Sequence, residues 1–376
     1  MSGVSQAGGP LVESRPHKGR IDGWLILATL LLLVVGLMSL YSIDYSAGGS
    51  RHFSRQLLRL AIGGLPLLLF LLVNPKALQR NATAIYLLNL GLLALVLIAG
   101  QRSGGAQRWV SMGPIEFQPS EMAKLLTVIT LAAFFAQRQE HVGRLGTYAL
   151  SLLHIAVPLG LIFVQPHLGA SLAILIAWLG VSLVAGVRFR YLAATVLGAA
   201  ALLAVAFTVP GVLKDYQLER VRAMFGGDPQ GSKFQVLRAQ YAFAAGGLTG
   251  VGYLKGEQKR AGFVPEQHTD FIFTVIGEEG GLVGCTLVLA AFGFFFYRIW
   301  LIILRASDPF YRLLAAGIYS VLAFHALVNI GMNLELLPVV GLWLPFMSYG
   351  GTAIWLCLAS VGLLLNIRAR ERPVLF

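Results

Sequence analysis

The sequence predicts an all-α, polytopic membrane protein, and three observations support that class. Hydrophobic residues make up 57% of the chain, whereas charged residues make up only 12%. Apolar runs of roughly 20 residues, long enough to cross a bilayer core of about 30 Å, recur along its whole length. Most of the charged residues fall between these runs. A soluble protein of this size would not need uninterrupted apolar runs such as 24–40 and 193–209.

About ten transmembrane helices are expected, with boundaries that hold to within a few residues. The expected spans are 22–42, 57–73, 83–99, 121–136, 147–164, 170–186, 191–209, 269–297, 312–332 and 347–367. They divide the chain into a cytoplasmic N-terminal tail at 1–21, a single transmembrane domain at 22–367 and a cytoplasmic C-terminal tail at 368–376. The first span is too long for the core of a signal peptide and is expected to stay as an anchor.

The distribution of positive charge predicts the orientation of these helices. Lys and Arg precede the first span, follow the last and fill the loops of the same side, so both termini are expected in the cytoplasm. One large extracytoplasmic loop, 210–268, is expected between spans seven and eight. This loop is also basic, but long loops are translocated largely regardless of their charge. Within it, 216–225 and 234–245 are predicted to form amphipathic helices at the membrane interface.

The net charge of +12 raises the question of a nucleic-acid partner, which the charge pattern disfavours. The basic residues sit between spans and form no dense patch. Anionic lipid headgroups and lipid-linked phosphates are the favoured partners. The two cysteines, Cys285 and Cys357, lie inside apolar spans, and we interpret them as small buried hydrophobic residues rather than as a disulfide or a metal site.

A polar cluster at 265–270 leads directly into the eighth span and ends in Asp270. Charged groups beside hydrocarbon are costly, so such a cluster is a candidate functional site. On a helix, Asp270, Thr274, Gly277 and Gly281 would share one face. One interpretation is that the glycines admit a neighbouring helix while Asp270 caps the span. The other is that Asp270 stands over an open groove as a general base. The residues alone do not choose between them.

Three further carboxylates and a lysine lie inside the predicted spans. Glu121 and Lys124 are i, i+3 neighbours at the start of the fourth span and can pair on one helix face. Such a pair is either satisfied within itself or presents a cation to a substrate phosphate. Glu278 and Glu279 lie deeper in the eighth span, where a structural ion pair is supported at least as well as catalysis.

Weaker signals lie elsewhere in the chain. Arg108-Trp109, in an outer loop, is interpreted either as a membrane anchor or as a sugar-stacking Trp beside a phosphate-binding Arg. The glycine-rich run 246–252 lacks the sequence context of a P-loop or a dinucleotide fingerprint, so a connecting role is favoured. A structural role is favoured for His167. No set of His and carboxylate residues has convincing metal-ligand spacing.

Six motifs in order along nearly the whole chain together resemble the SEDS family (shape, elongation, division and sporulation) of bacterial cell-wall polymerases. They are GAQRW at 105–109, QPSEMAK at 118–124, QPHLG at 165–169, GGLTGVG at 246–252, PEQHTDFIF at 265–273 and LPFMSYGGT at 344–352. No single motif suffices, but six in this order are very specific. The run 329–333, together with 265–268, is more similar to the RodA (elongation) branch than to the FtsW (division) branch.

The resemblance implies a peptidoglycan glycosyltransferase that polymerises lipid II on the outer face of the bacterial cytoplasmic membrane during cell elongation. Asp270 matches the family's catalytic aspartate, which implies that it deprotonates the acceptor 4-hydroxyl. Inversion at the donor anomeric carbon then releases undecaprenyl pyrophosphate. Expected partners are lipid II, a class B penicillin-binding protein (a transpeptidase) and other membrane proteins of the elongation complex.

The resemblance and the residue types together suggest further site residues. The residues expected to bind substrate or its pyrophosphate are Lys124, Glu121, Arg108, Trp109, Arg220 and Arg222. Those expected to support Asp270 from nearby are Glu266, His268 and Glu278. A divalent cation, Mg²⁺ or Mn²⁺, is a further candidate for neutralising the pyrophosphate, although no ligand set is evident.

Two positions depart from the family pattern. His167 stands where the family usually has Asp, and Arg238-Ala239 where it usually has Gln-Ser. An active enzyme is still expected, because Asp270 and the other motif residues match. Two competing functions remain open: a flippase or transporter for a lipid-linked precursor, and a non-catalytic scaffold for other cell-wall enzymes.

Overall fold

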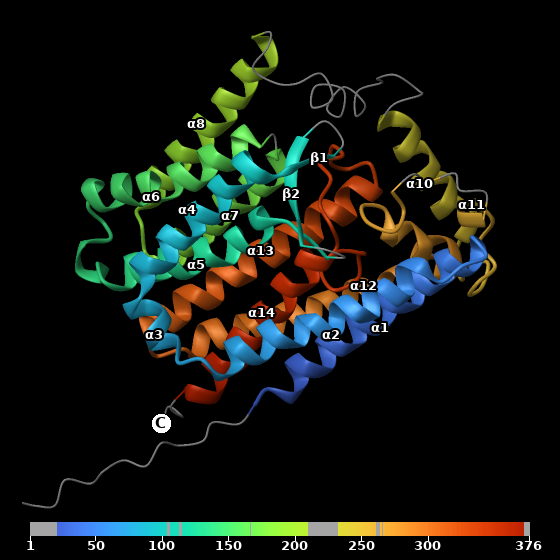
Figure 1. Cartoon of the computed structure of the whole chain (residues 1–376), viewed down its shortest axis with the longest axis horizontal. Helices are drawn as coiled ribbons and strands as arrows, with labels where there is room; N and C mark the ends of the chain where they lie inside the picture. Colours follow the sequence, from blue (N-terminus) through green and yellow to red (C-terminus); the bar gives the residue numbers. More distant parts are fainter. Residues whose placement is uncertain are drawn as a thin grey trace, which may run out of the picture.

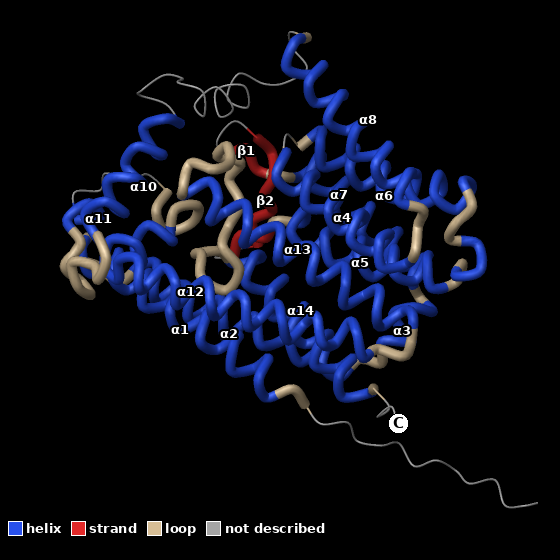
Figure 2. The backbone as a smooth tube through the Cα atoms, turned by 180° about the vertical axis from the view of Figure 1, so that it is seen from behind, coloured by secondary structure: helices blue, strands red, loops and turns tan. Residues whose placement is uncertain are grey.

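The protein forms a bundle of long helices, seen here in a computed structural model (Figures 1 and 2). The structure describes residues 21–103, 106–112, 115–165, 167–209, 232–260, 264 and 266–371. Within these ranges, 9 helices are long and apolar enough to cross a membrane. The prediction of a polytopic helical membrane protein is therefore confirmed.

The helices and strands follow one another in this order. They are α1 (Gly23–Ser46), α2 (Arg51–Leu72), α3 (Pro75–Arg80), α4 (Ala82–Ala99), β1 (Gln101–Ser103), β2 (Ala106–Met112), β3 (Ile115–Phe117), α5 (Pro119–Ala136), the 3₁₀ turn η1 (Gln139–His141), α6 (Leu145–Val164), α7 (Leu168–Ala185), α8 (Phe189–Thr208), α10 (Ser232–Gly246), α11 (Glu257–Arg260), α12 (Ile272–Arg305), α13 (Pro309–Asn333) and α14 (Gly351–Arg370).

The described helices match nine of the ten expected spans, and the tenth differs. The expected span 191–209 corresponds to α8, whose apolar stretch, Phe189–Leu202, is shorter than the others. Figure 1 places the start of α1 and the end of α14 at the same end of the bundle, the arrangement expected for an even number of crossings.

A small antiparallel sheet, β1-β2-β3, adds to the helical fold between α4 and α5. Its middle strand pairs Trp109 with Gln101 and Val110 with Phe117. Two of its strands have only 3 residues, so they show no readable alternation of apolar and polar side chains. Sequence periodicity therefore could not reveal this element, although its Trp, Val and Phe residues favour strands.

Helices α5, α13 and α14 form the buried centre of the bundle, and small residues let their neighbours approach closely. A Cβ on Gly362 of α14 would lie 2.4 Å from the Leu67 carbonyl oxygen of α2. A Cβ on Gly317 of α13 would lie 2.4 Å from a methyl carbon of Val128 in α5. Such glycines allow the van der Waals contact that holds helices together in lipid, where no hydrophobic force acts between them.

Helix α12 is interrupted at Gly281, where φ is 62° and ψ is −159°. The glycine-rich segment that follows α10 supplies partners for the backbone at this break. Leu282 N–H donates to the Gly247 carbonyl (2.9 Å), and Val251 N–H donates to the Glu278 carbonyl (3.0 Å). A break within a membrane helix is tolerated when neighbouring segments bond the freed backbone groups. Segment 246–252 therefore bonds the broken backbone of α12, which is more than the connecting role that the sequence favoured.

This packing decides between the two interpretations of the glycines in α12. A Cβ on Gly277 would lie 2.1 Å from the Phe243 ring, and one on Gly281 would lie 2.4 Å from the Gly250 nitrogen. The face below Asp270 is thus filled by α10 and the segment after it. The interpretation of an open groove along this face is wrong, because the absent side chains make room for the Phe243 ring and for the backbone of segment 246–252 rather than for a ligand.

Gly246→Ala is expected to destabilise the protein by about 1–3 kcal/mol, the usual cost of overpacking. The new Cβ would lie 1.9 Å from the Gly277 carbonyl oxygen, which belongs to helix backbone and has little room to move. Thermal unfolding in detergent measures the effect. Gly280→Ala is the matched control, because nothing lies within 4 Å of its Cβ and Ala favours the helix. Equal shifts in both variants would contradict the packing argument.

Candidate functional site

The turn 266–271 presents Asp270 at the start of α12. The Glu266 carbonyl accepts the N–H groups of Thr269 (3.1 Å), Asp270 (3.0 Å) and Phe271 (3.4 Å). Glu266 has a φ of 51°, in the left-handed region that L-residues seldom adopt. Phe271, not Asp270, occupies the N-cap position of α12, and no side chain caps the helix there. The capping interpretation of Asp270 is therefore wrong.

Two asparagines of α13 fix the backbone of Asp270. The Asp270 carbonyl accepts Nδ2–H bonds from Asn329 (2.8 Å) and Asn333 (2.9 Å), both side chains being fully buried. Asn329 also donates to the Leu342 carbonyl at 2.6 Å. The side chain of Asp270 itself is half-buried. A rigidly held main chain thus positions a carboxylate at the boundary between the bundle and its surroundings.

The loop before α14 is joined to the same turn from the other side. Ser348 Oγ donates to the Thr269 carbonyl at 2.6 Å, and Tyr349 N–H donates to the His268 carbonyl at 2.9 Å. Gln56 of α2 donates through Nε2 to the Ser348 carbonyl (3.2 Å). The motifs at 265–273 and 344–352, far apart in sequence, therefore form one structural unit around Asp270.

A cluster of aromatic and basic side chains borders this unit. The His52 and His268 ring centroids are 4.4 Å apart, and the Arg59 guanidinium lies 4.1 Å from the centre of the Tyr349 ring. His52 Nδ1 lies 2.6 Å from Asp44 Oδ1. Burial, and next the neighbouring His52, lower the pKa of His268 below its usual value. This shift favours the neutral form of the His268 imidazole.

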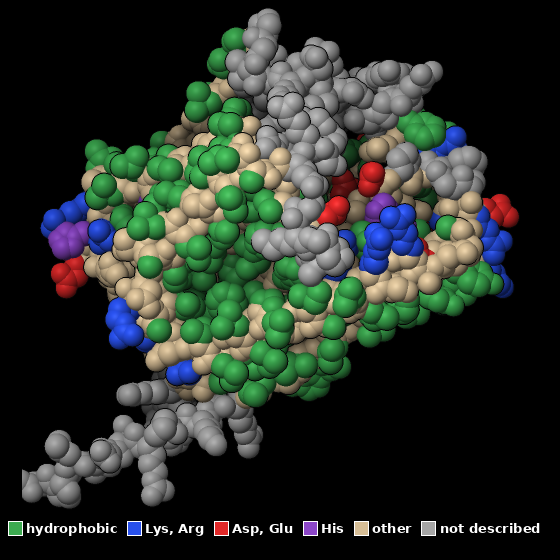
Figure 3. Space-filling model, in the orientation of Figure 1, with side chains coloured by type: hydrophobic (Ala, Val, Ile, Leu, Met, Phe, Trp, Pro, Cys, Tyr) green, Lys and Arg blue, Asp and Glu red, His purple; other side chains and the backbone are tan. Residues whose placement is uncertain are grey.

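Figure 3 shows acidic, basic and histidine side chains side by side in a hollowed part of one face of the molecule. The sequence pointed to His268 but not to His52 or Arg59. The available signal is the basic run at 51–59, at the start of the second span. By themselves, these residues indicate only a positively charged loop. Nothing in their sequence shows that α2 begins beside the Asp270 turn.

Lys124 lies in a closed network beneath the site. Its ammonium group donates to Glu121 Oε1 (2.9 Å) and Oε2 (2.8 Å) and to His325 Nε2 (2.8 Å). Trp343 Nε1–H donates to Glu121 Oε2 at 2.8 Å, and its ring stacks on His325 with centroids 4.0 Å apart. Lys124 is 0% exposed. The three N–H donors of the ammonium group thus have three acceptors.

The same face of α13 connects this network to Asp270. His325, Asn329 and Asn333 are spaced four residues apart, so they lie one above another along the helix. His325 lies roughly 12 Å deeper than Asn333 along the axis. Lys124 and Asp270 therefore border the same face of α13, but Lys124 is interior. A direct contact between Lys124 and a pyrophosphate is not present in this arrangement and stays a prediction.

The remaining predicted residues are distributed differently. Arg108 Nε donates to the Gln165 carbonyl at 3.1 Å and so ties β2 to the end of α6, and the neighbouring Trp109 is half-buried. Glu266 has an exposed side chain within the Asp270 turn. Arg220 and Arg222 lie outside the described residues. The same holds for the expected helix at 216–225.

Glu278 and Glu279 face the segment around α11. Glu278 Oε1 accepts the Gln258 N–H at 2.7 Å. Glu279 forms an ion pair with Lys259 and accepts the Ser42 hydroxyl at 2.6 Å. The structural ion pair suggested by the sequence is thus present for Glu279, whereas Glu278 bonds the backbone at Gln258. The role of Glu278 in supporting Asp270 stays a prediction.

The two departures from the family pattern occupy different places. His167 Nδ1 lies 3.1 Å from Ser120 Oγ, which places the ring at the N-terminal end of α5. Arg238 lies over the Phe234 ring at 4.9 Å, and Ala239 is 0% exposed in a cluster with Phe271. Among the described residues, no group of three or more His, Cys, Asp or Glu residues is placed to hold a metal ion. The predicted divalent cation therefore has no protein ligand set in this part of the chain.

Comparison with known proteins places this architecture in a family. A family model described as "Cell cycle protein", covering FtsW, RodA and SpoVE, matches residues 23–373. The chain belongs to this FtsW/RodA/SpoVE family. The resemblance seen in the six motifs is thereby confirmed, and two of the motifs meet at the Asp270 turn in the fold.

Curated FtsW/RodA/SpoVE relatives align over nearly their whole length. The chain is 33% identical to "Peptidoglycan glycosyltransferase MrdB" of Escherichia coli K12, covering 94% of this chain and 95% of the relative. It is 34% identical to "Probable peptidoglycan glycosyltransferase FtsW" of Thiomicrospira cyclica, covering 94% and 93%. Both branches match equally well.

Solved structures share the fold. Thermus thermophilus RodA superposes with a TM-score of 0.70 at 30% identity, covering 93% of this chain and 96% of that one. A chain from a study entitled "Structural coordination of polymerization and crosslinking by a peptidoglycan synthase complex" superposes with a TM-score of 0.80 at 33% identity, covering 93% and 97%.

On the prediction that Asp270 is the general base, replacing Asn329 and Asn333 together by Ala is expected to slow polymerisation by roughly 10- to 100-fold, because small misplacements of a catalytic group are costly. The Asp270 carbonyl would lose both of its side-chain donors. Single-turnover polymerisation assays measure the rate. Asn366→Ala is the control, because Asn366 also donates to two backbone carbonyls, those of Phe70 and Val73, far from Asp270. Equal rate losses in both would argue against a positioning role.

Proposed function

We propose that the protein is a peptidoglycan glycosyltransferase that polymerises lipid II into glycan strands. The observation that supports this most directly is the placement of Asp270, a half-buried carboxylate whose main chain is fixed by Asn329 and Asn333. Family membership and the names of the relatives support the same reaction.

In the proposed mechanism, the Asp270 carboxylate takes the proton from the 4-hydroxyl of the acceptor sugar. The resulting oxygen attacks the anomeric carbon of the donor while the bond to the pyrophosphate oxygen breaks. The configuration inverts, and undecaprenyl pyrophosphate leaves with the bonding electrons. His52 and Arg59, which border the Asp270 unit, supply N–H donors beside the chemistry, where negative charge develops, and Arg108 is a further predicted contact.

We further propose that the protein works in cell elongation at the bacterial cytoplasmic membrane, with the Asp270 end facing outward. The charge distribution between loops supports this orientation. The likeness to a chain from a peptidoglycan synthase complex supports a partner that crosslinks the strands, a class B penicillin-binding protein. The run 329–333 supports the elongation branch, alongside other membrane proteins of that complex.

The ion pairs inside the bundle favour this proposal over a transporter. Lys124 pairs with Glu121, and Glu279 pairs with Lys259. A transport pathway needs charged groups that face a water-filled route and exchange partners. These groups are instead enclosed and paired with each other.

The experiment combines the purified protein with lipid II in detergent, with and without a class B penicillin-binding protein. Glycan chains separated by gel electrophoresis are the expected product. A flippase would instead move fluorescent lipid II across proteoliposomes without forming chains. A scaffold would do neither, and either result would reject the proposed activity.

A further inference from the structure

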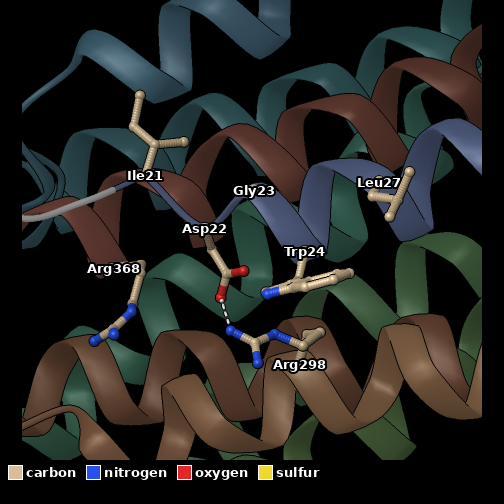
Figure 4. Close-up of a pocket in the computed structure, with 7 residues that line it drawn as sticks. All are labelled: Ile21, Asp22, Gly23, Trp24, Leu27, Arg298 and Arg368. Atoms are coloured by element: carbon tan, nitrogen blue, oxygen red, sulfur yellow. Dashed lines mark hydrogen bonds and ion pairs between the residues drawn. The ribbon is translucent and has the colours of Figure 1, made fainter.

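A cavity lies at the opposite end of the bundle from Asp270. Its volume is about 570 Å³. It is lined by Ile21, Asp22, Gly23, Trp24, Leu27, Arg298 and Arg368 (Figure 4). Arg298 follows the break in α12 at Gly281 by 17 residues, which corresponds to roughly 26 Å of helix, and Asp270 lies on the other side of that break. The cavity is therefore separate from the candidate active site.

The polar wall of this cavity contains arginine N–H groups beyond those that form the hydrogen bonds described here. Asp22 is fully engaged, because Oδ1 accepts the Leu25 N–H (3.0 Å) and Oδ2 accepts Arg298 Nη2–H (2.7 Å). Arg298 Nε is buried and has no partner among the described residues. Arg368 donates through Nη1 to Glu371 Oε2 at 2.5 Å. Since a guanidinium carries five N–H donors, both arginines retain donors beyond these bonds.

The local charge is positive after this pairing. Asp22 and Glu371 are balanced by Arg298 and Arg368. Arg305, seven residues after Arg298 at the end of α12 and outside the cavity lining, adds a further cation at this end of the bundle. An anion that entered the cavity would meet this excess charge and the free guanidinium donors together.

The other wall is apolar and faces outward. Ile21, Trp24 and Leu27 are 56%, 59% and 53% exposed. The Trp24 ring lies edge-on to Phe294 of α12, with centroids 6.1 Å apart. Figure 4 shows the Trp24 ring beside the Asp22–Arg298 ion pair. Because α1 is a candidate membrane span, these side chains lie where a helix leaves the bilayer, the usual place of Trp in membrane proteins.

We propose that this cavity binds the phosphate headgroup of an anionic phospholipid. Arg298 and Arg368 contact the phosphate oxygens, and the acyl chains follow the outward face of Trp24 and Leu27 toward the bilayer centre. A lipid matches both walls at once, because it joins a phosphate to hydrocarbon. A free phosphate ion would use the arginines but leave the apolar wall without a partner.

Native mass spectrometry of the purified protein in detergent tests the proposal, with phosphatidylglycerol and phosphatidylcholine added in equal amounts. The test variant combines Arg298→Gln and Arg368→Gln with Asp22→Asn and Glu371→Gln, so that no buried carboxylate is left without its cation. We expect bound phosphatidylglycerol to fall roughly tenfold, the effect of losing charge-assisted hydrogen bonds. Arg312→Gln is the matched control, since Arg312 lies at the start of α13, outside the cavity lining. Equal retention in the two proteins would overturn the proposal.

Two further measurements separate a bound lipid from a free anion and from a loss of folding. Trp24→Ala removes a largely exposed side chain, so it keeps the fold if the quadruple variant unfolds. It is also expected to reduce phosphatidylglycerol retention. Unchanged retention in Trp24→Ala would overturn the placement of the acyl chains. Inorganic phosphate at millimolar concentration is expected to leave the lipid bound. Displacement by phosphate would identify a free anion as the ligand and reject the lipid. None of these measurements depends on glycan polymerisation.

Discussion

Asp270→Asn is expected to abolish measurable glycan polymerisation, with a rate reduction of about 10²- to 10⁴-fold, the contribution of a positioned general base. The amide has nearly the same shape as the carboxylate but cannot accept the proton of the acceptor hydroxyl. The turn itself should persist, because Asn329 and Asn333 bond the backbone carbonyl of residue 270 rather than its side chain. Glycan chain formation from lipid II, followed by gel electrophoresis, is the measurement.

Glu266→Gln is the matched control for this experiment. Glu266 belongs to the same turn, but its side chain is exposed and its carbonyl, not its carboxylate, organises the turn. We expect this variant to retain most of the activity. Both variants should keep the wild-type unfolding temperature. Polymerisation by Asp270→Asn at the wild-type rate would show that another group is the base.

Lys124→Met is expected to destabilise the protein by about 3–5 kcal/mol, the usual effect of breaking a buried ion pair by removing one partner. Glu121 is only 2% exposed, so its negative charge would remain buried. Among the described residues, the Trp343 Nε1–H group would be the hydrogen-bond donor left to its carboxylate. His325 would lose the partner of its Nε2 atom. Thermal unfolding in detergent, followed by loss of monomer on gel filtration, measures the change.

The double variant Glu121→Gln/Lys124→Met separates the structural role from a substrate role. It removes both charges, so it should be clearly more stable than Lys124→Met alone. If Lys124 acts only in the network, activity should recover along with stability. A stable double variant that binds lipid II but does not polymerise it would instead support the predicted contact between Lys124 and the pyrophosphate.

Only part of the candidate site could be predicted from the sequence. Asp270 stood out because a charged residue at the edge of an apolar span is rare and costly. Glu121 and Lys124 stood out because i, i+3 spacing puts them on one helix face. In contrast, His325 is 201 positions from Lys124, and Ser42 is 237 positions from Glu279. No local pattern shows which distant polar group satisfies a buried one.

The sequence by itself determined the class of the protein and the positions of most spans, and it marked Asp270 as a candidate functional residue. These features depend on hydrophobicity over about 20 residues and on the cost of a charge near lipid, both of which are local properties. Only the tertiary structure decided that the glycines of α12 receive the segment 246–252 and that Lys124 is enclosed. Those outcomes depend on which helix faces meet, because a glycine or an ammonium group takes its role from the atoms packed against it.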